Sequence, residues 1–213
     1  GQNLLMHAYE EIFSQHRITI AQALLTRTDI SNRCGYLNAR NTLLALMELG
    51  VICIVNENDV VATDEIQKMR FGDNDNLSAM VANLIDADLL VLLTDVSGLY
   101  TADPSSNPGA QLIHRVDKID ASVEKLAGKT SRMQGTGGMI TKIQAAKLAT
   151  SSGTNVVIAS GEEPEILVKI DAGERSGTFF PAQGNKLESR KRWMLSGLSS
   201  RGCITADKGA ILA

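Results

Sequence analysis

Two kinds of apolar pattern alternate along the chain. Four segments place apolar side chains on one face of a helix: residues 4–13, 39–49, 76–85 and 139–150. Four others are short apolar runs of the kind that forms strands: residues 18–25, 51–55, 89–93 and 156–158. The last three of these runs are continuous, which is typical of strands buried on both faces. Because such strands alternate with helices, the pattern predicts an α/β fold with a mainly parallel sheet and helices on both of its faces.

The pattern weakens after residue 160. Residues 161–185 are rich in loop-forming residues, with one short helix expected over 164–170. The charged stretch 188–193 predicts a solvent-exposed helix, and residues 203–209 predict a strand followed by a turn.

The composition is that of an ordinary globular domain. Of the 213 residues, 44% are hydrophobic and 21% are charged, which excludes disorder or a coiled coil as a description of the whole chain. The net charge of -3 and an aromatic content of 4% argue against nucleic acid as the main partner. No apolar run approaches the length of a membrane span, and Cys34, Cys53 and Cys203 match no zinc or redox spacing. We therefore expect a cytoplasmic protein with reduced thiols and no membrane association.

Polar residues directly follow two of the predicted strands. Asn56 comes after the run 51–55, and Thr94 and Asp95 come after the run 89–93. The carboxyl ends of parallel strands share one edge of a sheet, and ligands bind at that edge in open α/β folds. We therefore expect these polar groups to converge on one site.

A glycine-rich stretch over residues 135–138 is the strongest local signal for phosphate binding. Glycines let the backbone approach a ligand closely, and the N–H groups at the start of the following helix favour an anion. The side chain of Lys142 leans back toward the start of that helix and can reach a bound phosphate. The lysine stands four residues after the last glycine, so this is not a Walker A motif. The alternative is a flexible loop and a helix with a surface lysine.

The segment 72–76 is unusually polar for the start of a helix. Its two aspartates, Asp73 and Asp75, can order Mg²⁺ or position a lysine, because carboxylates are hard ligands for this ion. The alternative is ordinary helix capping, for which Asp and Asn are favoured. One cap explains only one of these polar residues, which favours a functional role.

Together these stretches resemble the amino acid kinase family and, within it, the glutamate 5-kinases. The segments that carry the resemblance are residues 54–59, 72–79, 92–104, 135–142 and 190–193. The segment 92–104 is shared with aspartate kinases and some nucleotide kinases, whereas its combination with the Asn56 and Gly72 motifs is more specific. The likeness extends from the first residues to about Trp193.

The resemblance implies an αβα sandwich that transfers the γ-phosphoryl group of Mg-ATP to the γ-carboxylate of L-glutamate. The product is glutamyl 5-phosphate, the first intermediate of proline synthesis. Residues at positions that match the family's glutamate site are Asn56, Asp59 and Asn74. Those that match its nucleotide site are Thr94, Asp95, Thr136, Gly137, Gly138, Met139, Ile140, Thr141 and Lys142. Asp75 matches an aspartate that organises the catalytic lysines of the family. We assign Lys142 to stabilising the charge of the transition state. The Mg²⁺ ion is expected to be held mainly by the ATP phosphates.

The sequence also departs from the family pattern. The family begins with a strand that carries a lysine in a Gly-Ser-Ser context, followed by a Ser-Ser-Gly phosphate loop, and neither occurs in the first part of this sequence. We therefore expect an N-terminally incomplete kinase domain over 1–195, then a linker and the start of an RNA-binding-type PUA domain over 196–213. The segment 66–71 is longer than usual where the family senses proline, a feedback inhibitor. The family also implies a homo-oligomer.

Two other functions remain open at this point. One is another amino acid kinase, such as an aspartate or acetylglutamate kinase. The other is a non-catalytic binding or regulatory module without the first-strand lysine.

Overall fold

A computed structural model describes residues 1–58, 74–129 and 138–186. The expected helix at 188–193, the expected strand at 203–209 and the proposed domain boundary near residue 195 lie outside these ranges. Among the described helices, none combines the length and the apolar character needed to cross a membrane.

The described strands form two sheets. β1 (Ile20–Leu25) pairs in parallel with β2 (Ile52–Glu57), and β3 (Leu89–Thr94) pairs in parallel with β4 (Asn155–Ser160). A short strand, β5 (Thr178–Phe180), runs antiparallel on the other edge of β4. The mainly parallel α/β fold is therefore confirmed, although β2 and β3 do not pair with each other.

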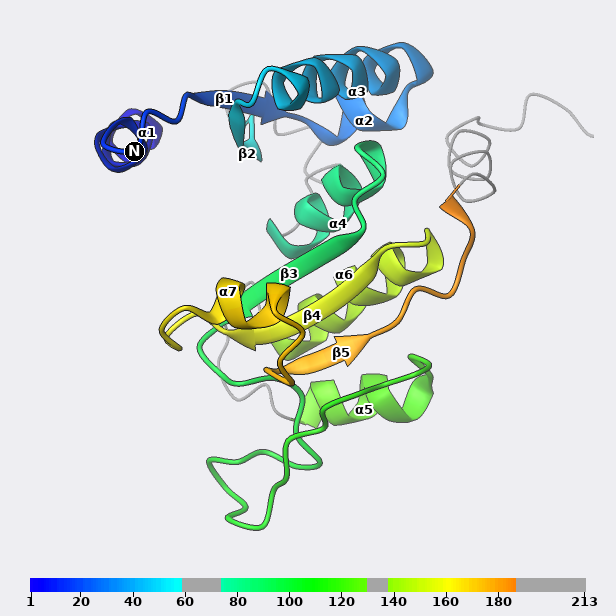
Figure 1. Ribbon diagram of the computed structural model, residues 1–213. Helices are drawn as coiled ribbons and strands as arrows, with labels where there is room; N and C mark the ends of the chain where they lie inside the picture. Colours follow the sequence, from blue (N-terminus) through cyan, green and yellow to red (C-terminus); the bar gives the residue numbers. More distant parts are fainter. Residues whose placement is uncertain (59–73, 130–137, 187–213) are drawn as a thin grey trace, which may run out of the picture.

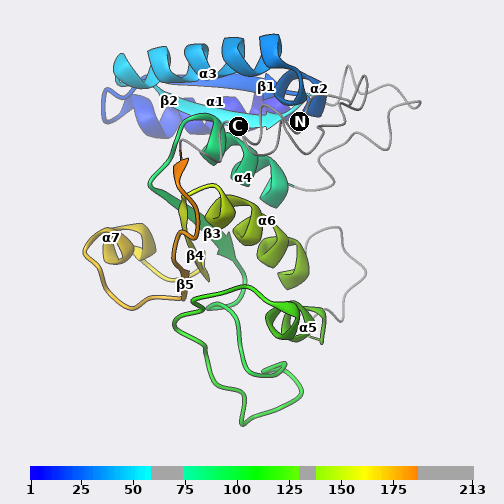
Figure 2. The ribbon, with the colours of Figure 1, turned by 90° about the vertical axis from the view of Figure 1, so that its right-hand side faces the viewer.

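Helices lie on both sides of these strands, as the pattern predicts. They are α1 (Gln2–Ser14), α2 (Arg27–Ser31), α3 (Arg33–Glu48), α4 (Asn74–Leu84), α5 (Ala121–Lys129), α6 (Met139–Ser151) and α7 (Ile166–Asp171). α6 covers one face of the β3–β4–β5 sheet and α7 lies beside the other face (Figures 1 and 2). α3 and α1 flank the β1–β2 sheet in the same manner.

The expected burial of the strands is correct for β4 and wrong for β2 and β3. Residues 156–159 of β4 are all buried, because β4 has a strand on each side and helices on each face. By contrast, Ile52 in β2 and Leu89 and Leu93 in β3 are 39%, 40% and 46% exposed. Among the described strands, β2 and β3 each have a partner on one side only, so that parts of their side chains remain open to solvent.

Local chemistry explains where several elements differ from the prediction. α3 begins earlier than expected because the Asn32 side chain accepts a hydrogen bond from the Gly35 N–H at 2.7 Å, a typical N-cap. α5, which the sequence pattern did not predict, follows Asp120, whose carboxylate accepts bonds from the N–H groups of Ser122 and Val123. The short helix α2 and the strand β5 were likewise not predicted.

One helix, α4, joins two apolar cores. Its residues Leu77 and Leu84 pack in the core around β1, β2 and α3. Ala79, on another face of the same helix, is fully buried in the core around β3, β4 and α6. The small side chain of Ala79 allows α4 and α6 to pack closely, so that the position of α4 sets the position of residues at its first turn.

Candidate active site

The first turns of α4 and α6 bring together an acidic and a basic side chain that are distant in the sequence. Asp75 belongs to the first turn of α4, and Lys142 to the first turn of α6. The Lys142 Nζ lies 3.1 Å from Oδ2 and 3.4 Å from Oδ1 of Asp75. Their side chains are only 11% and 16% exposed, respectively. The structure thus brings these two predicted site residues together.

Thr141 completes this cluster. Its hydroxyl Oγ1 lies 2.8 Å from the Asp75 Oδ2 and 2.7 Å from the carbonyl oxygen of Gly138. Asp75 Oδ2 therefore accepts from both the hydroxyl and the ammonium group. We call Asp75, Thr141 and Lys142 the helix-start cluster.

The electrostatics of the helix-start cluster suit an anionic ligand. The N-termini of α4 and α6 carry partial positive charge, which favours negatively charged groups. The Asp75 carboxylate offsets part of this positive charge. An ammonium group in a partly buried setting is screened less by salt than an exposed one. Lys142 is therefore a positive charge held in place at a helix N-terminus, an arrangement that can bind and stabilise a phosphoryl group.

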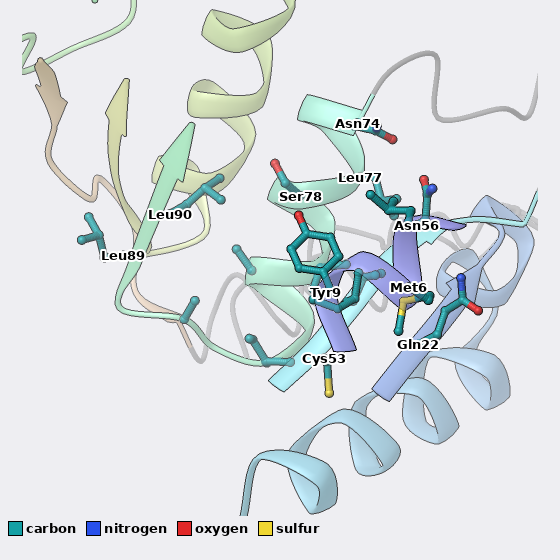
Figure 3. Close-up of a pocket in the computed structure, with 17 residues that line it drawn as sticks. Met6, Tyr9, Gln22, Cys53, Asn56, Asn74, Leu77, Ser78, Leu89 and Leu90 are labelled. Carbon is teal, nitrogen blue, oxygen red and sulfur yellow. The ribbon is translucent and has the colours of Figure 1, made fainter. Parts of the chain in front are cut away.

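A cavity of about 470 Å³ lies between the two sheets. Its walls come from β2, β3, α4 and α1, and Figure 3 shows Met6 and Tyr9 of α1 extending into this region. The side chains of Asn56 and Asn74, two predicted substrate ligands, lie toward one end of the cavity in Figure 3. Amide groups of this type donate to and accept from an amino acid's charged groups.

The apolar wall of the cavity changes the chemistry of one thiol. Cys53 lies on β2 within the cavity lining, and burial raises the pKa of its thiol above the ordinary value. A thiol with a raised pKa carries little thiolate at neutral pH and is a poor nucleophile. Cys53 therefore suits a packing role on β2, whereas Cys34 is exposed.

The predicted nucleotide residues Thr94 and Asp95 lie at the carboxyl end of β3. The Thr94 hydroxyl donates to Asp95 Oδ1 at 2.9 Å, and the Gly161 N–H donates to the Thr94 carbonyl at 2.8 Å. Within the described residues, no hydrogen bond or ion pair joins Thr94 or Asp95 directly to the helix-start cluster. The two groups are thus placed by different elements.

Ser160 belongs at the same sheet edge but was not predicted. It ends β4 directly beside Thr94 in the strand register, and its hydroxyl accepts from the Glu162 N–H at 3.2 Å. The rule that identified Thr94, a polar residue at the end of an apolar run, applies equally to Ser160.

Residues at the start of α6 divide into two roles. Gly138 occupies the N-cap position, and its carbonyl accepts from the N–H groups of Thr141 and Lys142. The side chains of Met139 and Ile140 pack against the apolar core, which leaves their backbone N–H groups as the means of contacting a ligand. Three other predicted site residues, Asp59, Thr136 and Gly137, lie outside the described residues, as does the segment 66–71.

The described part of the chain holds no group of three or more His, Cys, Asp or Glu residues that could bind a metal ion. The Asp75 carboxylate is engaged by Lys142, whereas Asp95 is exposed and offers an oxygen ligand at the sheet edge. Asp95 could therefore contribute one oxygen ligand to a metal ion that is bound to a nucleotide.

Known proteins resemble this chain in both sequence and fold. The chain is 62% identical over 213 residues to the glutamate 5-kinase of Dehalococcoides mccartyi, and 53% identical to that of Herpetosiphon aurantiacus. Both matches cover 100% of this chain but only 57% of the relative, so the chain spans little more than half of their length. The structure resembles UMP kinase from Ureaplasma parvum with a TM-score of 0.54 and 14% identity, over 82% of this chain and 65% of that one.

The family relationship rests on a wider pattern than any single relative. The sequence model of the amino acid kinase family matches residues 1–160, which include β1 to β4 and the helix-start cluster. The likeness to UMP kinase shows the same fold at low sequence identity. The chain therefore belongs to the amino acid kinase family.

Proposed function

We propose that the protein containing this chain transfers the γ-phosphoryl group of ATP to the γ-carboxylate of L-glutamate. The observation that carries the proposal is the pairing of Lys142 with Asp75 at the start of two helices, at 3.1 Å. The choice of glutamate is supported by the 62% identity to a glutamate 5-kinase. The product is glutamyl 5-phosphate, which feeds proline synthesis.

The reaction suits residues that position charge rather than transfer protons. The γ-carboxylate of glutamate is already deprotonated at neutral pH, so its oxygen attacks phosphorus without a general base. The bond between the γ-phosphorus and the β,γ-bridging oxygen breaks, and ADP leaves. Both reactants are anions, so the protein must offset their repulsion and hold them in line.

Each part of the site has a role in this scheme. Lys142 and the N–H groups at the start of α6 stabilise the charge of the transferring phosphoryl group. Asn56, Asn74 and Asp59 bind glutamate, while Thr94 and Asp95 bind the nucleotide together with the loop that includes Thr136, Gly137 and Gly138. Mg²⁺ bound to the ATP phosphates would neutralise part of their charge, and Asp95 could supply it with an oxygen ligand.

The proposal extends to the setting of the enzyme. We expect a cytoplasmic homo-oligomer for which proline is a feedback inhibitor. These points follow from the likeness to glutamate 5-kinases and are tested by the oligomeric mass and by proline titration of the full-length protein.

The deciding experiment measures ADP release by the full-length protein with Mg-ATP and one amino acid at a time. We expect release with L-glutamate and background rates with aspartate or acetylglutamate. Hydroxylamine in the same assay converts an acyl phosphate to a hydroxamate, so equal amounts of ADP and hydroxamate identify transfer to a carboxylate. Activity with aspartate or acetylglutamate alone would assign another amino acid kinase. No activity with any acceptor would favour the non-catalytic module.

A further inference from the structure

Thr141 belongs to the segment expected to bind nucleotide, but its contacts indicate a different role. Its backbone N–H donates to the Gly138 carbonyl at 3.1 Å, and its hydroxyl contacts the Asp75 carboxylate at 2.8 Å. Both donor groups of Thr141 are therefore engaged within the protein. A nucleotide ligand would instead be expected to present a donor to the phosphates.

The single proton of the Thr141 hydroxyl has two acceptors within reach. The Gly138 carbonyl lies at 2.7 Å and Asp75 Oδ2 at 2.8 Å. The carbonyl already accepts from the backbone N–H of Thr141, whereas the carboxylate is ionised and a stronger acceptor. The hydroxyl proton is therefore better placed on Asp75.

Asp75 in turn determines where the Lys142 ammonium group lies. The two side chains come from different helices, and Nζ bonds to both carboxylate oxygens. An aspartate carboxylate can rotate about χ2, a broad torsion with little intrinsic preference. The Thr141 hydroxyl fixes Oδ2 on one side, which leaves a defined direction for the bonds to Lys142.

We infer that Thr141 is a positioning residue that orients Asp75 and, through it, Lys142. Thr141 and Lys142 are neighbours on α6, and both side chains bond to the Asp75 carboxylate of α4. The inference deepens the proposed kinase function and rests on it only for its effect on turnover. Its effect on the position of Lys142 is independent of the substrate.

The first test compares three variants of the full-length protein. Thr141→Val removes the hydroxyl but keeps the branched shape, and Thr141→Ser keeps the hydroxyl. Thr150→Val is a matched control, because Thr150 lies on the same helix and its hydroxyl bonds the Ala146 carbonyl at 2.8 Å, away from Asp75. A bond to a charged group contributes enough for about a tenfold effect on rate.

We expect Thr141→Val to lower kcat about tenfold with the KM for ATP nearly unchanged. Thr141→Ser should retain most of the wild-type kcat, as should Thr150→Val. In an Asp75→Ala background, Thr141→Val should have no further effect, because the residue acts through Asp75. A raised KM for ATP with additive effects would instead make Thr141 a direct nucleotide ligand and overturn the inference.

A second readout does not require catalysis. An amine-acylating reagent is applied to each folded variant, and the modification rate of Lys142 is followed by peptide mass spectrometry. We expect Thr141→Val to raise the rate for Lys142 about threefold to tenfold, because the ammonium group is held less firmly. Lys147 on the same helix is exposed and serves as an internal reference whose rate should not change.

The two readouts separate the inference from the proposed function. If the wild type releases no ADP with glutamate but Lys142 reactivity follows this order, only the proposed function fails. If ADP is released but Thr141→Val matches Thr150→Val in both kcat and Lys142 reactivity, only the inference fails. Faster modification of Lys147 as well would reveal loosened folding, and Thr141→Ser then decides, since a positioning hydroxyl keeps Lys142 at the wild-type rate.

Discussion

Lys142 is both largely buried and positively charged, a combination that is uncommon among lysines. Its side chain is only 11% exposed, yet it belongs to the start of α6, and the N–H groups at the start of a helix favour anions. Removing an ammonium group from water is costly unless a partner compensates, and Asp75 supplies that partner. In the proposed reaction, this pair holds the positive charge in place before ATP binds, which limits the reorganisation that phosphoryl transfer needs.

The positive charge of Lys142 should be required for a normal rate of turnover. We expect Lys142→Met in the full-length protein to lower kcat by about 10²-fold or more, because methionine fills similar space but stabilises no phosphoryl charge. The assay is ADP release with glutamate. Lys147→Met is the control, since Lys147 lies on the same helix but forms an exposed ion pair with Glu124. An unchanged turnover for Lys142→Met would contradict the role assigned to Lys142.

At the scale of elements, the ends of helices and strands determine the local order of the fold. The β5 strand is only three residues long, yet it carries Thr178, whose buried hydroxyl accepts from the Leu99 N–H at 2.8 Å. Gly177 precedes this strand with a φ of +78°, a conformation that side chains other than glycine rarely adopt. The path of the chain into β5 therefore depends on this glycine.

Two glycines of nearly equal φ test this dependence. A Cβ at Gly177 would overlap the carbonyl oxygen of Ile158 in β4, whereas a Cβ at Gly173, with a φ of +79°, meets nothing within 4 Å. We expect Gly173→Ala to cost about 1–2 kcal/mol from its backbone conformation alone. Gly177→Ala should cost clearly more, because β4 or β5 must also move. Thermal unfolding measures both, and equal Tm values for the two variants would contradict the clash.

The start of α5 gives a prediction about pH. The Ser122 hydroxyl and the N–H groups of Val123 and Ser122 hold the pKa of the Asp120 carboxyl below its usual value of 3.8. A lowered pKa in the folded state means that ionised Asp120 stabilises the fold above its unfolded pKa. This stabilisation is lost as the pH falls through the folded pKa.

We therefore expect Asp120→Ala to lower the Tm by about 2–4 °C near neutral pH. The difference from wild type should shrink as the pH falls below the unfolded pKa and on through the lower pKa of the folded state, where the native carboxylate becomes protonated. Asp120→Asn keeps a neutral capping oxygen and should remain closer to wild type at neutral pH. A Tm difference for Asp120→Ala that is constant down to strongly acidic pH would exclude an ionised cap.

At the scale of the whole molecule, α4 connects the two apolar cores and carries Asp75. Leu77 and Leu84 anchor it to the core of β1 and β2, and Ala79 anchors it to the core of β3 and β4. Arg40 of α3 reinforces this arrangement by donating to the Leu84 carbonyl and to the Asp86 carboxylate. The distance between Asp75 and Lys142 is therefore a property of how α4 and α6 pack.

Enlarging the contact between α4 and α6 tests this coupling. Ala79 is 0% exposed, so Ala79→Leu must push the helices apart and should destabilise the protein by about 1–3 kcal/mol. We also expect kcat for ADP release to fall, because Asp75 and Lys142 separate although neither is mutated. Ala8→Leu on the exposed surface of α1 is the matched control and should change neither quantity much. Lost stability with full activity would show that the pair does not depend on this packing.

The sequence by itself determined the helices α1, α4 and α6, the strands β1 to β4 and the polar residues at two strand ends. These features are local, because apolar periodicity states which face of a segment is buried. The polar segment 72–76 and the glycine-rich segment 135–138 also identified Asp75 and Lys142 as functional candidates. The sequence missed α2, α5 and β5, which are short and depend on a cap or on a neighbouring strand rather than on a long apolar pattern.

Only the tertiary structure decided which elements meet. Asp75 and Lys142 are separated by 67 positions, and their contact exists because α4 packs against α6. Likewise, the separation of the strands into two sheets and the half-exposed faces of β2 and β3 follow from the pairing of whole strands. An apolar pattern states that a face needs a partner but not which partner it finds, since that choice depends on how all the elements pack together.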